Sequence, residues 1–71
     1  MPFNYTTPDW KPLERAASLT NNGPSVKRFM WMCEEPQGTH QYKHSDTRRY
    51  AILRADSTPQ ECVTEIRKAL S

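Results

Sequence analysis

Apolar positions near the start of the chain follow the period of an α-helix. Trp10, Leu13 and Ala17 fall at i, i+3 and i+7, which places them on one helical face. Asp9 is a suitable N-cap, and Pro12 falls in the first turn, where a backbone donor is not yet needed. The residues that follow are typical of a helix end: Asn21, Asn22, Gly23 and Pro24. We predict a helix over about residues 10–20, after a polar and flexible lead-in at residues 1–8.

The middle of the chain changes to short bulky segments separated by turn residues. Residues 26–34 contain Phe29, Met30, Trp31 and Met32 in succession, which favours a strand. Turns are expected at residues 35–38 and around residues 45–47, because both stretches are rich in turn-forming residues. Two more strands are then expected at about residues 39–44 and 48–55. The pattern predicts a three-stranded antiparallel meander.

The last segment has the clearest start signal in the chain. Thr58 is followed by Pro59 at the first helical position and by Glu61 at the third, which is a capping box. Apolar residues then recur at i, i+3 and i+7: Val63, Ile66 and Leu70. The predicted order is helix, strand, strand, strand, helix (αβββα). We therefore expect a single α+β domain over residues 9–71, with both helices on one face of the sheet.

Strand register decides which side chains are buried. A first hairpin centred between Pro36 and Gln37 pairs Cys33 with His40, and a three-residue second loop is the favoured choice. The core face of the sheet then carries Phe29, Trp31, Cys33, Tyr42, Tyr50 and Ile52. The opposite face carries Arg28, Met30, Met32, Gln41, Lys43, Arg49, Ala51 and Leu53. A four-residue second loop is the alternative, and it exchanges Tyr50 and Ile52 with Arg49, Ala51 and Leu53.

Composition makes the core unusual without removing it. Leu, Ile, Val and Phe make up only ten of the 71 residues, but the chain also has two Trp, three Tyr and three Met. These large side chains favour a folded domain over a disordered one. No apolar run is long enough to cross a bilayer, and residues 1–10 do not form a signal peptide. We expect a soluble, cytoplasmic protein whose two cysteines are buried free thiols.

Catalysis and metal binding are both disfavoured by the spacing of the reactive residues. His40 and His44 are four residues apart on a predicted strand, about 13 Å at 3.3 Å per residue. One zinc ion cannot reach both, because each ligand must lie about 2.1 Å from it. Cys33 opposite His40 is the nearest arrangement to a nucleophile and base. We expect neither an enzyme nor a site for a metal or cofactor.

Positive charge is concentrated in the predicted second hairpin. The whole chain has a net charge of only +2, yet residues 39–55 hold Lys43, Arg48, Arg49 and Arg54 against Asp46 alone. Cations interleaved with tyrosines are typical of surfaces that bind phosphates and stack bases. The sequence therefore predicts a small binding module for an anionic partner, with RNA or DNA as the candidate. The expected contacts are Arg28, Lys43, Arg48 and Arg49.

Two other interpretations of the same face remain open. The cations can be ordinary solvated residues that protect the edge of a small sheet. Alternatively, Met30, Met32 and Leu53 can form an apolar surface for a protein partner, an inhibitor target or a second copy of the chain.

The order of elements and the length resemble the double-stranded-RNA-binding domain family. The comparison covers residues 9–70, and Pro36, Gln37, Gly38, Thr39 and His40 stand where that family has a Gly-Pro-x-His signature. The resemblance implies the same αβββα fold and contact with RNA. The family's lysine cluster at the start of the last helix should fall at residues 57–64, a stretch that has no basic residue in this chain.

Overall fold

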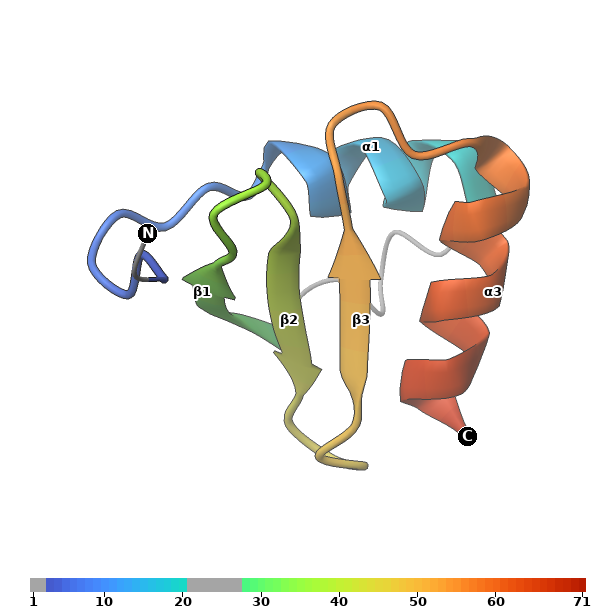
Figure 1. Cartoon of the computed structure of the whole chain (residues 1–71). Helices are drawn as coiled ribbons and strands as arrows, with labels where there is room; N and C mark the ends of the chain where they lie inside the picture. The colour runs from blue at the N-terminus through green and yellow to red at the C-terminus, as the bar shows by residue number, and fades with distance from the viewer. Residues whose placement is uncertain (1–2, 21–27) are drawn as a thin grey trace.

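A computed structural model describes residues 3–20 and 28–71 of the chain. Helix α1 (Lys11–Thr20) is followed by strands β1 (Phe29–Glu34), β2 (His40–His44) and β3 (Tyr50–Leu53), and by helix α3 (Pro59–Leu70). The strands form one antiparallel sheet in the order β1-β2-β3 (Figure 1). The predicted α+β class and αβββα order are confirmed. The predicted helix end at residues 21–24 and the start of the first predicted strand lie outside the described residues.

Both helices pack on one face of the sheet and on each other. In Figure 1, α1 crosses one end of the sheet and α3 runs alongside β3. The helices contribute Leu13, Ala16, Cys62, Ile66 and Ala69 to one buried cluster. The sheet contributes Phe29, Tyr42, Ala51 and Leu53, with Trp31 partly buried against them. Burial of this apolar surface is the main force that holds the layers together.

The start of α1 is held by polar contacts to the residue predicted as its cap. One carboxylate oxygen of Asp9 accepts a hydrogen bond from the Lys11 amide at 3.0 Å, which satisfies a donor that the helix leaves unpaired. The buried face is rotated from the predicted one, because Pro12, Leu13 and Ala16 are buried whereas Trp10 is exposed. The Trp10 ring instead lies beside the Tyr42 ring, with centroids 5.8 Å apart.

Helix α3 begins as predicted. The Thr58 hydroxyl accepts from the Glu61 amide at 3.1 Å, and the Glu61 carboxylate accepts from the Thr58 amide at 2.8 Å. Pro59 occupies the first helical position, where its missing N–H costs nothing. The deepest residues of the helix are Cys62, Ile66 and Ala69, and the predicted Val63 and Leu70 are only half-buried beside them.

A bulge in β1 changes part of the predicted first hairpin. Phe29 pairs with His44 and Trp31 with Tyr42, as expected, but the register shifts between Trp31 and Cys33. Met32 is the extra residue, so Cys33 pairs with Gln41 instead of His40. The predicted Cys33–His40 pair is therefore wrong.

The second hairpin has the alternative register. His44 and Arg49 close a turn of four residues, because the His44 amide donates a hydrogen bond to the Arg49 carbonyl at 2.8 Å. Tyr42 consequently pairs with Ala51, and His40 pairs with Leu53. Ala51 and Leu53 are fully buried, whereas Tyr50 is exposed. The favoured three-residue loop was wrong, because one extra turn residue moves every β3 side chain to the other face.

The residues before α1 are fixed to the sheet at one point. Asn4 forms an isolated antiparallel bridge with Glu34, with backbone bonds of 2.8 Å in both directions. Its side-chain oxygen also accepts from the amide of Thr6 at 3.0 Å. The outer edge of β1 is thus capped at its end. In the described ranges, neither helix has the length and apolar character needed to span a bilayer.

Candidate functional site

The sheet surface turned away from the helices, called here the outer face, carries one row of side chains across all three strands. Met30, Lys43 and Tyr50 are register neighbours on β1, β2 and β3. They alternate with the buried Phe29, Tyr42 and Ala51 along the strands, which places them on the opposite side. Met30 is 48% exposed and Tyr50 is 41% exposed. The row therefore presents a thioether, an ammonium group and a phenol ring to solvent.

Lys43 and Tyr50 interact directly within this row. The Lys43 ammonium nitrogen lies over the Tyr50 ring, 5.9 Å from its centroid, within reach of a cation–π contact. Lys43 forms no ion pair with an acidic side chain in the part of the chain that the structure describes. Its charge is free to meet an anion that approaches the outer face.

Two more cations precede Tyr50 in the β2–β3 turn. Arg48 and Arg49 are exposed, and neither guanidinium pairs with a carboxylate among residues 3–20 and 28–71. Arg48 has φ 60°, which is the left-handed region that L-residues rarely adopt. The exposed charges of the turn are thus Asp46, Arg48 and Arg49, with Lys43 beside them.

The turn that carries these arginines is anchored to the rest of the domain. The Thr47 hydroxyl donates to the Ala69 carbonyl near the end of α3. The Thr47 amide donates to Nδ1 of the buried His44 at 3.3 Å, and the Arg49 amide donates to the Thr47 hydroxyl at 3.2 Å. Since the hydroxyl and amide of Thr47 are both engaged, the backbone under Arg48 and Arg49 has a defined position.

Arg28 lies beside the same turn, but its guanidinium group is paired with the Asp46 carboxylate. Its Nη1 atom is 3.1 Å and 3.3 Å from the two Asp46 carboxylate oxygens. Both side chains are more than half exposed, so this pair contributes little stability. It does neutralise the only acidic residue of the turn, which leaves the charges of Lys43, Arg48 and Arg49 uncompensated.

The predicted apolar contact surface is only partly present. Met30 lies on the outer face, and Met32 is half-buried at the bulge. Leu53 is fully buried in the core against the helices. Leu53 is therefore removed from the protein-binding candidate set, and the reason is the four-residue turn that sets the β3 register. Tyr50 and Ile52 occupy the β3 positions of the outer face instead, and the same register shift contradicts the predicted placement of Arg49 on that face.

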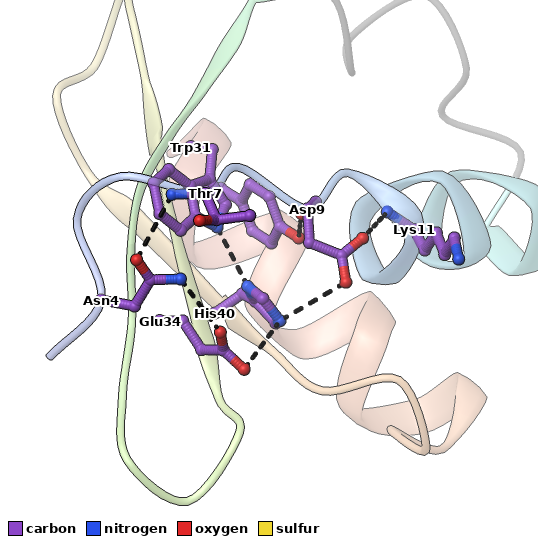
Figure 2. Close-up of polar contacts among 8 residues, drawn as sticks. Asn4, Thr7, Asp9, Lys11, Trp31, Glu34 and His40 are labelled. Atoms are coloured by element: carbon purple, nitrogen blue, oxygen red, sulfur yellow. Dashed lines mark hydrogen bonds and ion pairs between the residues drawn. The ribbon is translucent and has the colours of Figure 1, made fainter. Parts of the chain in front are cut away.

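A second group of polar side chains surrounds the buried residue His40, which is 5% exposed (Figure 2). Trp31 Nε1 donates to His40 Nδ1 at 3.0 Å. His40 Nε2 lies 3.8 Å from an Asp9 carboxylate oxygen and 3.8 Å from a Glu34 carboxylate oxygen. Asp9 and Glu34 also hold Lys11 and Asn4 respectively. The His40 cluster therefore joins β1, β2, the start of α1 and the N-terminal segment.

Hydrogen bonding assigns one tautomer to His40. Because the indole N–H can only donate, Nδ1 must be the accepting nitrogen, and the ring proton belongs on Nε2 between the two carboxylates. Sequence reasoning weighed His40 only with Cys33 and His44, and it missed Asp9 and Glu34. Their approach depends on how the N-terminal segment crosses the sheet, for which no local pattern gives a signal.

A groove of about 520 Å³ lies between β3 and the first turns of α3. Its walls include Ile52, Arg54, Glu61 and Glu65. Glu65 accepts from the Ile52 amide at 3.0 Å, and Arg54 is 3.3 Å from Asp56. The groove contains none of the predicted site residues, and two carboxylates make it a poor place for an anion.

Neither a metal site among the described residues nor a match of the chain to a known protein is found. In the described residues, no three His, Cys, Asp or Glu side chains gather closely enough to hold a metal ion. The first turn of α3 is acidic at Glu61 and has no lysine, unlike the family that the element order resembles. Comparison with protein-family models, with curated proteins and with solved structures finds no match.

Proposed function

We propose that this protein is a small non-catalytic module that binds nucleic acid, RNA or DNA, through the cations around the β2–β3 turn. The observation that carries the proposal is the grouping of Lys43, Arg48 and Arg49 at one end of the sheet. The single carboxylate of that turn, Asp46, is paired with Arg28. Closely spaced cations without carboxylate partners attract phosphates and release their counterions.

The buried reactive groups support a binding role over a catalytic one. His40 is enclosed, and the Cys33 thiol is also buried and belongs to a different register pair. Burial raises the pKa of the Cys33 thiol, and nearby Glu35 adds to the effect. A protonated, covered thiol is a poor nucleophile.

The experiment is a salt titration with a charge-matched control. The Lys43→Gln, Arg49→Gln double variant removes two cations of the turn, and Lys11→Gln, Arg67→Gln removes two exposed cations of the helices. We expect an oligonucleotide to bind the wild type with log K falling linearly with log salt concentration. The turn variant should bind more weakly, with a slope reduced by about one unit per lost phosphate contact. The helix variant should keep most of the wild-type slope.

An apolar protein contact is the second candidate, because Met30 is nearly half exposed in the same row. It predicts the opposite result. Binding of a protein partner should change little with salt and should fail in Met30→Gln, whereas the double charge variant should retain it. Absence of any oligonucleotide binding at low salt would remove the nucleic-acid proposal.

A further inference from the structure

The exposed ring of Tyr50 needs an explanation beyond charge. Tyr50 is the first residue of β3 and is 41% exposed on the face turned away from the helices. Phosphate binding requires cations and does not require an aromatic ring. An aromatic ring beside cations is the arrangement that adds base stacking to phosphate contact.

The surroundings of Tyr50 suit a single nucleotide unit. Lys43 places its ammonium group 5.9 Å from the ring centroid. Arg48 and Arg49 immediately precede the ring in the chain, but strand alternation directs Arg49 away from the outer face, so Lys43 is the cation beside the ring and Arg48 and Arg49 lie at the turn end of the sheet. Met30 lies two strands away in the same row, about 10 Å at the usual strand spacing. The row thus offers a stacking surface flanked by phosphate contacts, with an apolar side chain at its far end.

Base pairing decides which nucleic acid can use this surface. The bases of a duplex are stacked on each other, and only their edges reach the grooves. An exposed ring within a row of sheet side chains can stack only with a base that is unpaired. A duplex could still contact the arginines but would leave the ring unused.

We propose that the outer face selects single-stranded nucleic acid, with one unpaired base stacked on Tyr50, one flanking phosphate bound by Lys43, and the strand continuing past the turn, where Arg48 and Arg49 lie. This inference rests on the proposed function, because it names the substrate class of the same site. It predicts a short footprint, since Tyr50 is the one exposed aromatic ring on the outer face among the described residues of the three strands.

The test compares three ligands, of which the intact and abasic single strands have the same backbone charge and the duplex has about twice as much. These are a single-stranded oligonucleotide of roughly 12 nucleotides, the same strand annealed to its complement, and an abasic strand of equal length. At low salt we expect the single strand to bind more tightly than the abasic strand by about 5- to 150-fold, the range for one stacked base. The duplex should bind less tightly than the intact single strand despite its higher charge, because it offers no unpaired base.

Two tyrosine substitutions identify the ring responsible. Tyr50→Leu should reduce binding of the single strand to the level of the abasic strand without changing the salt slope, since no cation is lost. Tyr50→Phe should retain binding, because the stacking surface remains. Tyr5→Leu is the matched control: Tyr5 is also exposed but lies on the N-terminal segment, and its loss should have no effect. Amide shifts at residues 43 and 50 report the contact.

The outcomes separate the two proposals. If Tyr50→Leu binds like the wild type, or if the abasic strand binds as tightly as the intact one, stacking is wrong. The nucleic-acid proposal then survives on the Lys43, Arg49 variant alone. Tighter binding of the duplex than of the single strand also overturns the inference. If none of the three ligands binds, both proposals fail together.

Discussion

Arg48 is held in a backbone conformation that suits glycine better than arginine. Its φ of 60° lies in the left-handed region, which costs an L-residue about 1–2 kcal/mol. Replacement by glycine removes that cost but adds about 0.4–1 kcal/mol of backbone entropy to be lost on folding. We expect Arg48→Gly to raise the free energy of unfolding by up to about 1 kcal/mol while weakening oligonucleotide binding. Urea denaturation measures the first effect and a binding titration the second.

Arg49→Gly is the control for this prediction. It removes the same charge from the next position, and among the described residues only Arg48 combines a side chain with positive φ. We expect Arg49→Gly to lower the free energy of unfolding by about 0.5–1 kcal/mol, the usual cost of glycine in an extended segment. Equal changes in stability for the two variants would show that the turn backbone is not strained at Arg48.

The Trp31–His40 bond makes a prediction about a single proton. Nδ1 of His40 accepts from the indole, so the neutral ring carries its proton on Nε2, which faces Asp9 and Glu34. Nitrogen chemical shifts of the imidazole should identify this tautomer near neutral pH. Trp31→Phe should lower the free energy of unfolding by about 1–3 kcal/mol, because a buried acceptor loses its donor. Trp10→Phe, at an exposed tryptophan, should cost less; finding the proton on Nδ1 would contradict the assignment.

At the scale of the element, the capping box of α3 couples helix stability to pH. Hydrogen bonding from the Thr58 backbone amide, with Thr58's side chain and Arg54 adding to it, lowers the pKa of Glu61. A lowered pKa in the folded state means that the ionised carboxylate stabilises the protein above the ordinary glutamate range. This contribution is lost as pH falls through the folded-state pKa. We therefore expect Glu61→Gln to be less stable than the wild type at neutral pH and equal to it in acid.

Urea denaturation of both proteins across the acid range measures this difference. Gln at the same position can still accept the Thr58 amide, so the variant isolates the charge. Glu14→Gln removes a charge from the first turn of α1 without a capping bond, and we expect a smaller pH-dependent difference there. A wild-type advantage that persists unchanged in acid would show that the Glu61 charge does not act through the cap.

Local signals predicted the elements, whereas the register depended on contacts that are remote in sequence. The Thr58 capping box and the order of the strands are each determined by residues that are close together in the sequence. The bulge at Met32 adds one residue to the regular strand that was predicted, and the observed turn is one residue longer than the predicted three-residue loop. Thr47 favours the longer turn by binding the Ala69 carbonyl, 22 residues later. No local pattern contains that contact, so the face of Tyr50 could not be predicted.

The candidate site was predicted in part for the same reason. Charge patterning identified Lys43, Arg48 and Arg49 as candidate cations, but the face of Arg49 depended on the register of the second hairpin. Arg28 was identified too, but its pairing with Asp46 follows from the hairpin geometry. Tyr50 was assigned to the core and Leu53 to the surface, and the single register shift exchanged them. Side chains with mixed character are thus the hardest to place on a small sheet.

At the scale of the whole molecule, the core is small and one tyrosine is central to it. Tyr42 is fully buried and is the largest such side chain in the described residues. Its hydroxyl donates to the Asp9 carbonyl at 2.5 Å, which joins β2 to the start of α1. A core with few aliphatic residues therefore depends on an aromatic group that also carries a proton. Burial, reinforced by the nearby Asp9 carboxylate, holds the pKa of the Tyr42 phenol well above its ordinary value of 10.

This raised pKa predicts that the fold weakens in alkali. Stability from the neutral phenol is fully present below the unfolded-state pKa near 10. It falls as pH rises above that value, because the unfolded chain releases the proton while the folded chain retains it. The slope from one such group reaches about 1.4 kcal/mol per pH unit. Burial also raises the pKa of the Cys62 thiol, with the same sign from about pH 9 upward.

Tyr42→Phe separates the phenol from the thiols. The variant loses the bond to Asp9 and should be less stable at pH 7 by about 1 kcal/mol. Above pH 10 its free energy of unfolding should fall less steeply than that of the wild type, by up to about 1.4 kcal/mol per unit, so the two curves converge. Tyr5→Phe, at an exposed tyrosine, should leave the slope unchanged. If the free energies of unfolding of Tyr42→Phe and the wild type fell in parallel above pH 10, the phenol would have the same pKa in the folded and unfolded chains. That result would contradict the raised pKa of the buried Tyr42.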